Sequence, residues 1–217
     1  MLGVDAAAVA FKDGLFQTTA QNRRFSLFDL AQAIETDASL PDELRKPLAT
    51  VATFTGRIPA HPTGSAVCEV EIDAETGTVE LTRYTSVDDV GQPINPLILH
   101  GQVHGGIAQG VGQALCEGMA YDARSGQVLN ASFMDYAMPR ADMLPSFTVD
   151  MTEDPTSGNP LRVKGGGESG ITPALAAVGN AVADALAALG IEHVAMPATS
   201  YRIWQAIRDA KDKGSRT

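Results

Sequence analysis

The segment of the chain best suited to chemistry is a glycine-rich run that carries one lysine and one glutamate, Lys164-Gly165-Gly166-Gly167-Glu168-Ser169-Gly170. Glycine adopts backbone angles that other residues avoid, and it lets a ligand approach the main chain closely. A carboxylate such as Glu168, held beside a cofactor and away from water, can act as a general base. The same composition also fits a flexible turn whose glutamate only favours the start of the following helix.

A second candidate region combines glycine with glutamine at short intervals over residues 101–115. The amides of Gln102, Gln109 and Gln113 could recognise the donor and acceptor edge of a heterocycle, while the glycines allow a ligand to pack closely. A tight crossing between two helices would explain the same residues equally well. The sequence leaves these two interpretations open.

A third polar segment, residues 87–96, ends a predicted strand and holds Asp88, Asp89, Gly91 and Asn95. Carboxylate and amide groups at a strand end can hydrogen-bond the ring nitrogens of a ligand. The alternative is a turn in which an Asp or Asn side chain bonds its own backbone.

Side chains that could hold a metal ion are sparse. His100 and His104 are four residues apart, but Gly101 stands where a zinc protease would carry glutamate, and no third ligand is evident. Cys68 and Cys116 have neither zinc nor iron–sulfur spacing, so we expect two buried, reduced thiols. The sequence predicts no metal bound by the side chains of this chain.

The predicted strands come mainly in pairs. A short hairpin is expected within residues 4–17, turning at Lys12-Asp13-Gly14, and a clearer hairpin joins residues 67–72 to 79–84. Its second arm continues to Gly91, a further hairpin spans residues 119–137 with its turn at Ser125-Gly126, and one more strand covers residues 147–151. Antiparallel pairs of this kind favour an α+β fold with packed helices over a doubly wound sheet.

Four helices are predicted between these strands. Ser26 should cap a helix that ends near Glu35, residues 97–118 form a helix containing six glycines, and Thr172 with Pro173 should begin an alanine-rich helix that ends near Leu189. A last helix over residues 199–211 should bury its apolar side chains, namely Tyr201, Ile203, Trp204 and Ile207. Residues 36–60 are expected to form a connecting region. They are the last part of an N-terminal flanking segment, 1–60, which precedes the main domain, 61–217.

Composition excludes several classes of protein. The formal net charge is −10, which argues against a nucleic-acid-binding surface. No apolar run is long enough to span a membrane, and the N-terminal residues lack the basic start of a secretory signal. We therefore expect a cytoplasmic globular protein that binds small molecules.

The order of these segments resembles the molybdopterin-binding large subunit of the molybdenum hydroxylases, the family of xanthine dehydrogenase, aldehyde oxidase and carbon monoxide dehydrogenase. The resemblance covers about residues 66–208 and rests on VDDVGQPINP, GQVHGGIAQGVGQAL, SFMDYAMPR, NPLRVKGGGESG and NAVADAL, in that order. It implies the C-terminal cofactor-binding part of an oxidoreductase. Such enzymes hydroxylate aldehydes or N-heterocycles, or oxidise carbon monoxide.

The resemblance also implies roles for individual residues. The glutamate of the family's KGxGExG segment is its catalytic base, and Glu168 occupies that position. Cofactor contacts carry over to the polar and glycine positions of the three segments, namely Asp89, Gly91, Asn95, Gln102, Lys164, Gly165 and Gly167. The implied cofactor is molybdenum with molybdopterin, in bacteria usually the cytosine dinucleotide form.

Family large subunits are several times longer than these 217 residues. The resemblance therefore implies that the chain works with an N-terminal part of the large subunit, an iron–sulfur small subunit and an FAD-containing medium subunit. Alone it is expected to be inactive. The alternative is a non-catalytic assembly or binding module that has kept the same scaffold.

Overall fold

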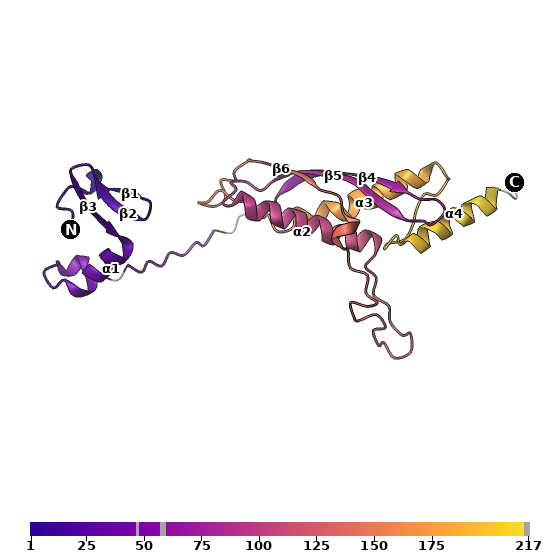
Figure 1. Cartoon of the computed structure of the whole chain (residues 1–217), viewed down its shortest axis with the longest axis horizontal. Coiled ribbons are helices and arrows are strands. Elements are labelled where there is room, and N and C mark those ends of the chain that lie inside the picture. Colours follow the sequence, from indigo (N-terminus) through magenta and orange to yellow (C-terminus); the bar gives the residue numbers. More distant parts are fainter. Residues whose placement is uncertain (47, 57–59, 215–217) are drawn as a thin grey trace. The chain divides into compact units, whose positions relative to one another are not determined.

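The computed structural model of the chain describes residues 1–46, 48–56 and 60–214. The chain forms two compact units, Met1–Thr55 and Gly56–Thr217, which are described separately (Figure 1). The predicted domain division at residue 60 adjoins residues 57–59, which lie outside the described part of the chain. No helix among the described residues is long and apolar enough to cross a membrane.

The first unit is a small antiparallel sheet followed by one long helix. Its strands are β1 (Ala10–Lys12), β2 (Leu15–Thr18) and β3 (Gln21–Ser26), paired in that order. Asp13 and Gly14 both have positive φ, 51° and 77°, as a two-residue hairpin turn requires. Helix α1 (Leu27–Thr36) begins with a capping box in which Ser26 and Asp29 bond each other's backbone. The predicted hairpin and helix are both confirmed.

The second unit is built on a mixed three-stranded sheet. β4 (Thr63–Ile72) pairs antiparallel with β5 (Val79–Asp89), and β5 pairs in parallel with β6 (Thr148–Thr152). A bulge between Glu69 and Val70 shifts the register, so that Leu81 and Tyr84 of β5 are both buried although they lie three residues apart. The predicted hairpin is confirmed, and so is the α+β fold class.

Three helices accompany this sheet, α2 (Pro96–Leu115), α3 (Ile171–Ala187) and α4 (Ser200–Gly214). The start of α3 differs from the prediction, because Gly170 and not Thr172 occupies the N-cap position. The N–H of Thr172 already donates to the carbonyl oxygen of Glu168 at 3.1 Å, so Thr172 lies inside the first turn. The helix therefore begins one residue after the glycine-rich run, which brings that run directly onto its first turn.

Two apolar clusters hold the second unit together. Residues of β5, α2 and α3 meet in the first cluster, where Tyr84, Ile107 and Val178 are fully buried. The second joins the end of α3 to α4 through Leu186, Ile203 and other side chains. The prediction that Tyr201 is buried was wrong, because its side chain is 67% exposed and lies on the outer face of α4. Cys68 and Cys116 are free but only partly buried.

The predicted hairpin over residues 119–137 is confirmed only around its turn at Ser125-Gly126. Only one bridge forms there, between Tyr121 and Val128, and the rest of the segment is an irregular excursion below α2 (Figure 1). A two-stranded ribbon has little stability unless a third strand or a helix covers it. The excursion lacks that cover within the described residues, and Phe133 and Met134 are 91% and 95% exposed.

Candidate cofactor and active site

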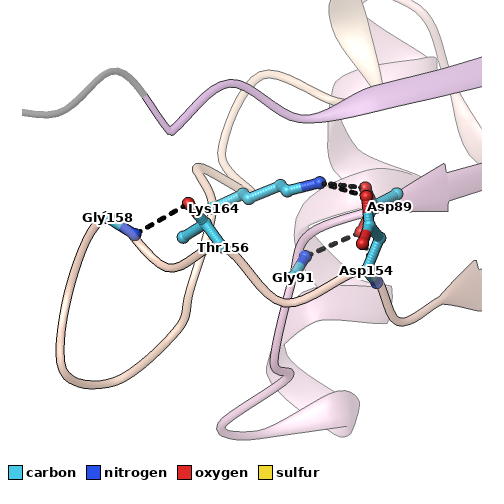
Figure 2. A network of polar contacts seen from close by, with 6 residues as sticks. All are labelled: Asp89, Gly91, Asp154, Thr156, Gly158 and Lys164. Atoms are coloured by element: carbon cyan, nitrogen blue, oxygen red, sulfur yellow. Dashed lines mark hydrogen bonds and ion pairs between the residues drawn. The ribbon is translucent and has the colours of Figure 1, made fainter.

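Asp89, the last residue of β5, is the centre of a polar network at one end of the sheet (Figure 2). Its Oδ1 accepts hydrogen bonds from the N–H groups of Gly91 at 2.9 Å and Asp154 at 3.1 Å. Its Oδ2 accepts a short hydrogen bond from Lys164 Nζ, which also lies 3.4 Å from Asp154 Oδ2. The side chains of Lys164 and Asp89 are only 13% and 9% exposed, so this ion pair is largely removed from water.

The turn after β5 lies directly against the segment that leads into the glycine-rich run. Lys164 N–H donates to the carbonyl oxygen of Val90 at 2.8 Å, and Gln92 N–H donates to that of Arg162 at 3.0 Å. Gly91 has a φ of 69°, and a Cβ there would lie 2.7 Å from the Arg162 oxygen. A glycine is therefore required at position 91 by the local backbone, whether or not a ligand is present.

The glycine-rich run itself is fixed at both ends. At its start, Gly165 N–H donates to the carbonyl oxygen of Ala60 at 2.9 Å. At its end, Gly170 packs so closely against the Val103 backbone of α2 that a Cβ would overlap it. Ser169 is buried and donates from its hydroxyl to the Gly166 carbonyl oxygen at 3.1 Å. The loop is therefore anchored at both ends, by contacts from Ala60 and from α2.

Glu168 lies between these two fixed ends, and its side chain is exposed. Within the described part of the chain, its carboxylate has no hydrogen-bond partner. The amide N–H groups of Gly166 and Gly167 likewise have no acceptor among the described residues, and no atom lies within 4 Å of the position that a Gly167 Cβ would take. The loop thus presents free N–H donors, which suit an anion, beside a carboxylate that can accept a proton.

Two further residues predicted to contact the cofactor, Asn95 and Gln102, belong to helix α2 and its cap. Asn95 caps α2, where its Oδ1 accepts from Ile98 N–H at 3.3 Å. Gln102 is exposed on α2, next to Gly101 and Gly105, where a Cβ would meet no atom of the described residues within 4 Å. Gly106, by contrast, faces α3, so a close helix crossing explains this glycine, while ligand contact at the open face stays a prediction.

Two neighbouring carboxylates at the end of β5 have opposite electrostatic surroundings. Burial raises the pKa of Asp88, which is 2% exposed and accepts a hydrogen bond only from the Ser86 hydroxyl among the described residues. Burial acts in the same direction on Asp89, but the Lys164 ammonium and the two backbone N–H donors outweigh it and lower the pKa of that carboxyl. Keeping Asp89 charged at neutral pH therefore costs less free energy than keeping Asp88 charged.

We expect Asp88→Asn to raise the free energy of unfolding at pH 7, because asparagine still accepts the Ser86 hydrogen bond without burying a charge. A carboxyl whose folded pKa is raised stabilises the fold most at low pH and loses that contribution as pH rises through the folded pKa. The advantage of the variant should therefore shrink from pH 7 towards pH 4. Chemical denaturation of both proteins across this range measures it, and a difference independent of pH would contradict the assignment.

His100 and His104 lie on one side of α2 with their ring centroids 6.5 Å apart, and His104 stacks edge-on against Phe147 at 5.7 Å. Among the described residues, no group of three or more His, Cys, Asp or Glu side chains is placed to hold a metal ion. Asp135, Tyr136 and Arg140, which could have formed one polar cluster, instead bond separate partners, namely Ser132, Glu117 and Asp142.

The sequence interpretation missed two residues that shape this site. Asp154 joins the Asp89–Lys164 pair from the loop after β6, and Ala60 holds the start of the glycine-rich run through its carbonyl oxygen. Neither residue stands in a motif. A backbone carbonyl contributes no side-chain signal at all, so only the three-dimensional fold reveals it.

The chain is similar in sequence to a family of known proteins. Residues 1–145 match the family model of the molybdopterin cofactor-binding domain. The match therefore includes the first 65 residues, in which no distinctive motif was recognised, and it ends before the glycine-rich run.

Individual relatives extend the similarity beyond residue 145. The chain is 36% identical over 214 residues to the nicotine 6-hydroxylase large subunit of Paenarthrobacter nicotinovorans, covering 98% of this chain and 26% of that protein. It is 38% identical over 149 residues to the carbon monoxide dehydrogenase large chain of Hydrogenophaga pseudoflava, covering 69% of this chain and 18% of the relative.

A solved structure of reconstituted CO dehydrogenase from Oligotropha carboxidovorans aligns with a TM-score of 0.78 and 31% identity. The alignment covers 98% of this chain and 26% of that one, so the chain spans about a quarter of the length of such relatives. The match of the family model over two thirds of the sequence and the shared fold agree with the earlier resemblance. The chain belongs to the molybdopterin cofactor-binding family of molybdenum hydroxylase large subunits.

Proposed function

We propose that this chain forms the cofactor-binding, base-carrying part of a molybdenum hydroxylase large subunit, with Glu168 as the catalytic base. One observation carries the proposal. An unpaired carboxylate stands on a loop whose two ends are fixed, beside two amide N–H groups that have no acceptor among the described residues. A proton acceptor that is held in place without being neutralised is what general-base catalysis requires.

The residues present fit an anionic pterin cofactor. The free N–H groups of Gly166 and Gly167 suit its phosphate or pyrophosphate oxygens, and the open surface at Gly101 and Gly105 admits a bulky group next to the α2 backbone. The Gln102 amide, exposed on the same helix, can hydrogen-bond a heterocycle. When bound, molybdopterin supplies the redox chemistry that takes electrons from the substrate carbon.

The part of Glu168 in this scheme is to accept a proton at its carboxylate as the substrate carbon is oxidised. Its efficiency depends on a dry pocket, because a carboxylate in bulk water is a weak base. Glu168 is exposed in this chain, so we propose that other parts of the large subunit complete that pocket. Relatives named for nicotine, aldehydes and carbon monoxide support an N-heterocycle, an aldehyde or carbon monoxide as the substrate.

The cofactor and partners follow from the same proposal. The cytosine dinucleotide form of molybdopterin would fit the similarity to carbon monoxide dehydrogenase large chains. Relatives named as a large subunit and as subunit gamma of a dehydrogenase complex support assembly with other subunits. We propose an iron–sulfur small subunit and an FAD-containing medium subunit as the route by which electrons leave.

Cofactor content of the complete complex tests this function. The large subunit containing this chain is purified with its partner subunits, and molybdenum is measured together with the nucleotide released from the pterin by acid hydrolysis. The proposal predicts about one molybdenum and one cytidine nucleotide for each large subunit. Absence of both molybdenum and pterin would instead favour a non-catalytic assembly module that has kept the scaffold.

A further inference from the structure

We propose that the Asp89–Lys164 ion pair, with Asp154 beside it, is a clamp that sets the position of the Glu168 loop. In this view Asp89 and Lys164 are positioning residues and do not bind the cofactor themselves. The inference rests on the proposed role of Glu168 as the base. It replaces the direct cofactor contacts that the family resemblance implied for these two residues.

The first argument is that both side chains are already engaged. Asp89 accepts hydrogen bonds from two backbone N–H groups at one oxygen and from the Lys164 ammonium at the other, so both of its oxygens are engaged. Lys164 is held between two carboxylates, and its side chain is only 13% exposed (Figure 2). A ligand could reach either group only after breaking a desolvated ion pair, which is costly.

The second argument concerns charge. Two carboxylates and one ammonium give the clamp a net charge of −1, counted over Asp89, Asp154 and Lys164. An anionic cofactor is not attracted to such a group. The uncharged N–H donors of Gly166 and Gly167 are a better place for its oxygens, because they carry partial positive charge and no acceptor among the described residues occupies them.

The third argument is mechanical. Lys164 lies four positions before Glu168, and the three residues between them are glycines without side chains that could hold the backbone. The position of Glu168 therefore depends on the anchors at the ends of the run. Gly170 holds one end against α2. The Lys164 side chain holds the other at the end of β5, together with the N–H bonds of Lys164 to Val90 and of Gly165 to Ala60.

The ionisation of the pair supports a permanent clamp. The hydrogen bond to Asp89 raises the pKa of Lys164 above its ordinary value, and the same bond helps to lower that of Asp89. The contribution of Asp89 is present above its ordinary pKa and is lost in acid, whereas that of Lys164 is present below its ordinary pKa and is lost in strong base. The pair is therefore intact throughout the neutral range.

Lys164→Met in the complete, cofactor-loaded complex tests the clamp. We expect kcat to fall on the order of 10²-fold, the scale of a base displaced by about 1 Å, with KM near wild type. Molybdenum and pterin nucleotide content should stay at the wild-type level, and hydrogen exchange of residues 163–170 should become faster. Lys164→Arg should recover part of the loss. Arg83→Met is the matched control, because it removes an exposed ion pair from β5, the strand that carries Asp89. It should change none of these values.

Asp89→Asn gives an independent variant in case the methionine protein does not fold. Asparagine keeps an oxygen for the Gly91 and Asp154 N–H groups, and it replaces the charged oxygen that binds Lys164 by an NH2 group, which cannot accept from the ammonium. It should reproduce the lower kcat and the faster loop exchange. Loss of pterin nucleotide with unchanged exchange would show instead that these residues bind the cofactor, and unchanged kcat with unchanged exchange would show that the clamp has no role.

The exchange measurement separates this inference from the function on which it rests. If Glu168→Gln remains active while Lys164→Met still loosens the loop, the base assignment fails but the anchoring of the loop stands. If Glu168→Gln is inactive while Lys164→Met alters neither the loop nor kcat, the clamp fails and the base assignment stands.

Discussion

Replacing Glu168 with glutamine in the complete large subunit is expected to lower kcat by about 10²- to 10⁴-fold, the usual contribution of a general base. Glutamine has the same shape and can still hydrogen-bond, but it cannot accept the proton. The loop should keep its position, because its anchors do not include the Glu168 side chain. Steady-state kinetics with the physiological electron acceptor, on preparations matched for molybdenum content, measures the effect.

Glu71→Gln provides the matched control for this variant. Glu71 is an exposed acid on β4, paired with Glu80 towards the opposite end of the sheet from Asp89, so its replacement makes the same chemical change away from the glycine-rich run. The control should retain full activity and full cofactor content. Near wild-type turnover in Glu168→Gln, at equal molybdenum and pterin content, would remove this residue from the mechanism.

The local structure of the second unit could be predicted well where neighbouring residues determine it. Runs of β-branched and apolar residues around the Asp73–Gly77 turn indicated the β4–β5 hairpin, and Pro93 and Pro96 indicated that its second strand stops there. These signals depend on residues a few positions apart. For the same reason they missed the parallel pairing of β5 with β6, which only a crossover through α2 brings about.

The site was predicted less completely, because its contacts span the chain. The glycine-rich run and Glu168 were found by composition and by resemblance. The partner of Lys164, however, lies 75 residues earlier at the end of β5, and nothing in either segment indicates the pairing. Asn95 shows the reverse difficulty, since a residue assigned to the cofactor on family grounds also has a local task as the cap of α2.

The glycines of α2 show what spacing along one helix can predict and what it cannot. Their spacing predicted bare backbone on one side, which two different partners could occupy. In the structure Gly106 and Gly110 face the start of α3, where a Cβ at Gly106 would lie 2.7 Å from Ile171 N. Gly101 and Gly105 meet nothing within 4 Å. Periodicity could show that some glycines are needed for close packing, but it could not show which ones.

Gly106→Ala is therefore expected to destabilise the 217-residue chain by about 1–3 kcal/mol, the usual cost of forcing a methyl group into a filled space. The added carbon would push α2 away from the first turn of α3, where Gly170 Cα also lies 3.0 Å from its position. Since the crowding atoms belong to the backbone, no side-chain rotation can relieve the overlap. Denaturant unfolding followed by circular dichroism measures the change.

Gly101→Ala is the matched substitution on the open face of the same helix. It adds the same methyl group where nothing lies within 4 Å, so only helix propensity changes, and alanine is favoured by up to about 1 kcal/mol. The two variants should thus shift the free energy of unfolding in opposite directions. Equal effects would show that the α2–α3 crossing does not depend on a bare backbone at Gly106. The close approach of Gly170 to α2 anchors one end of the Glu168 loop, and it would then need another cause.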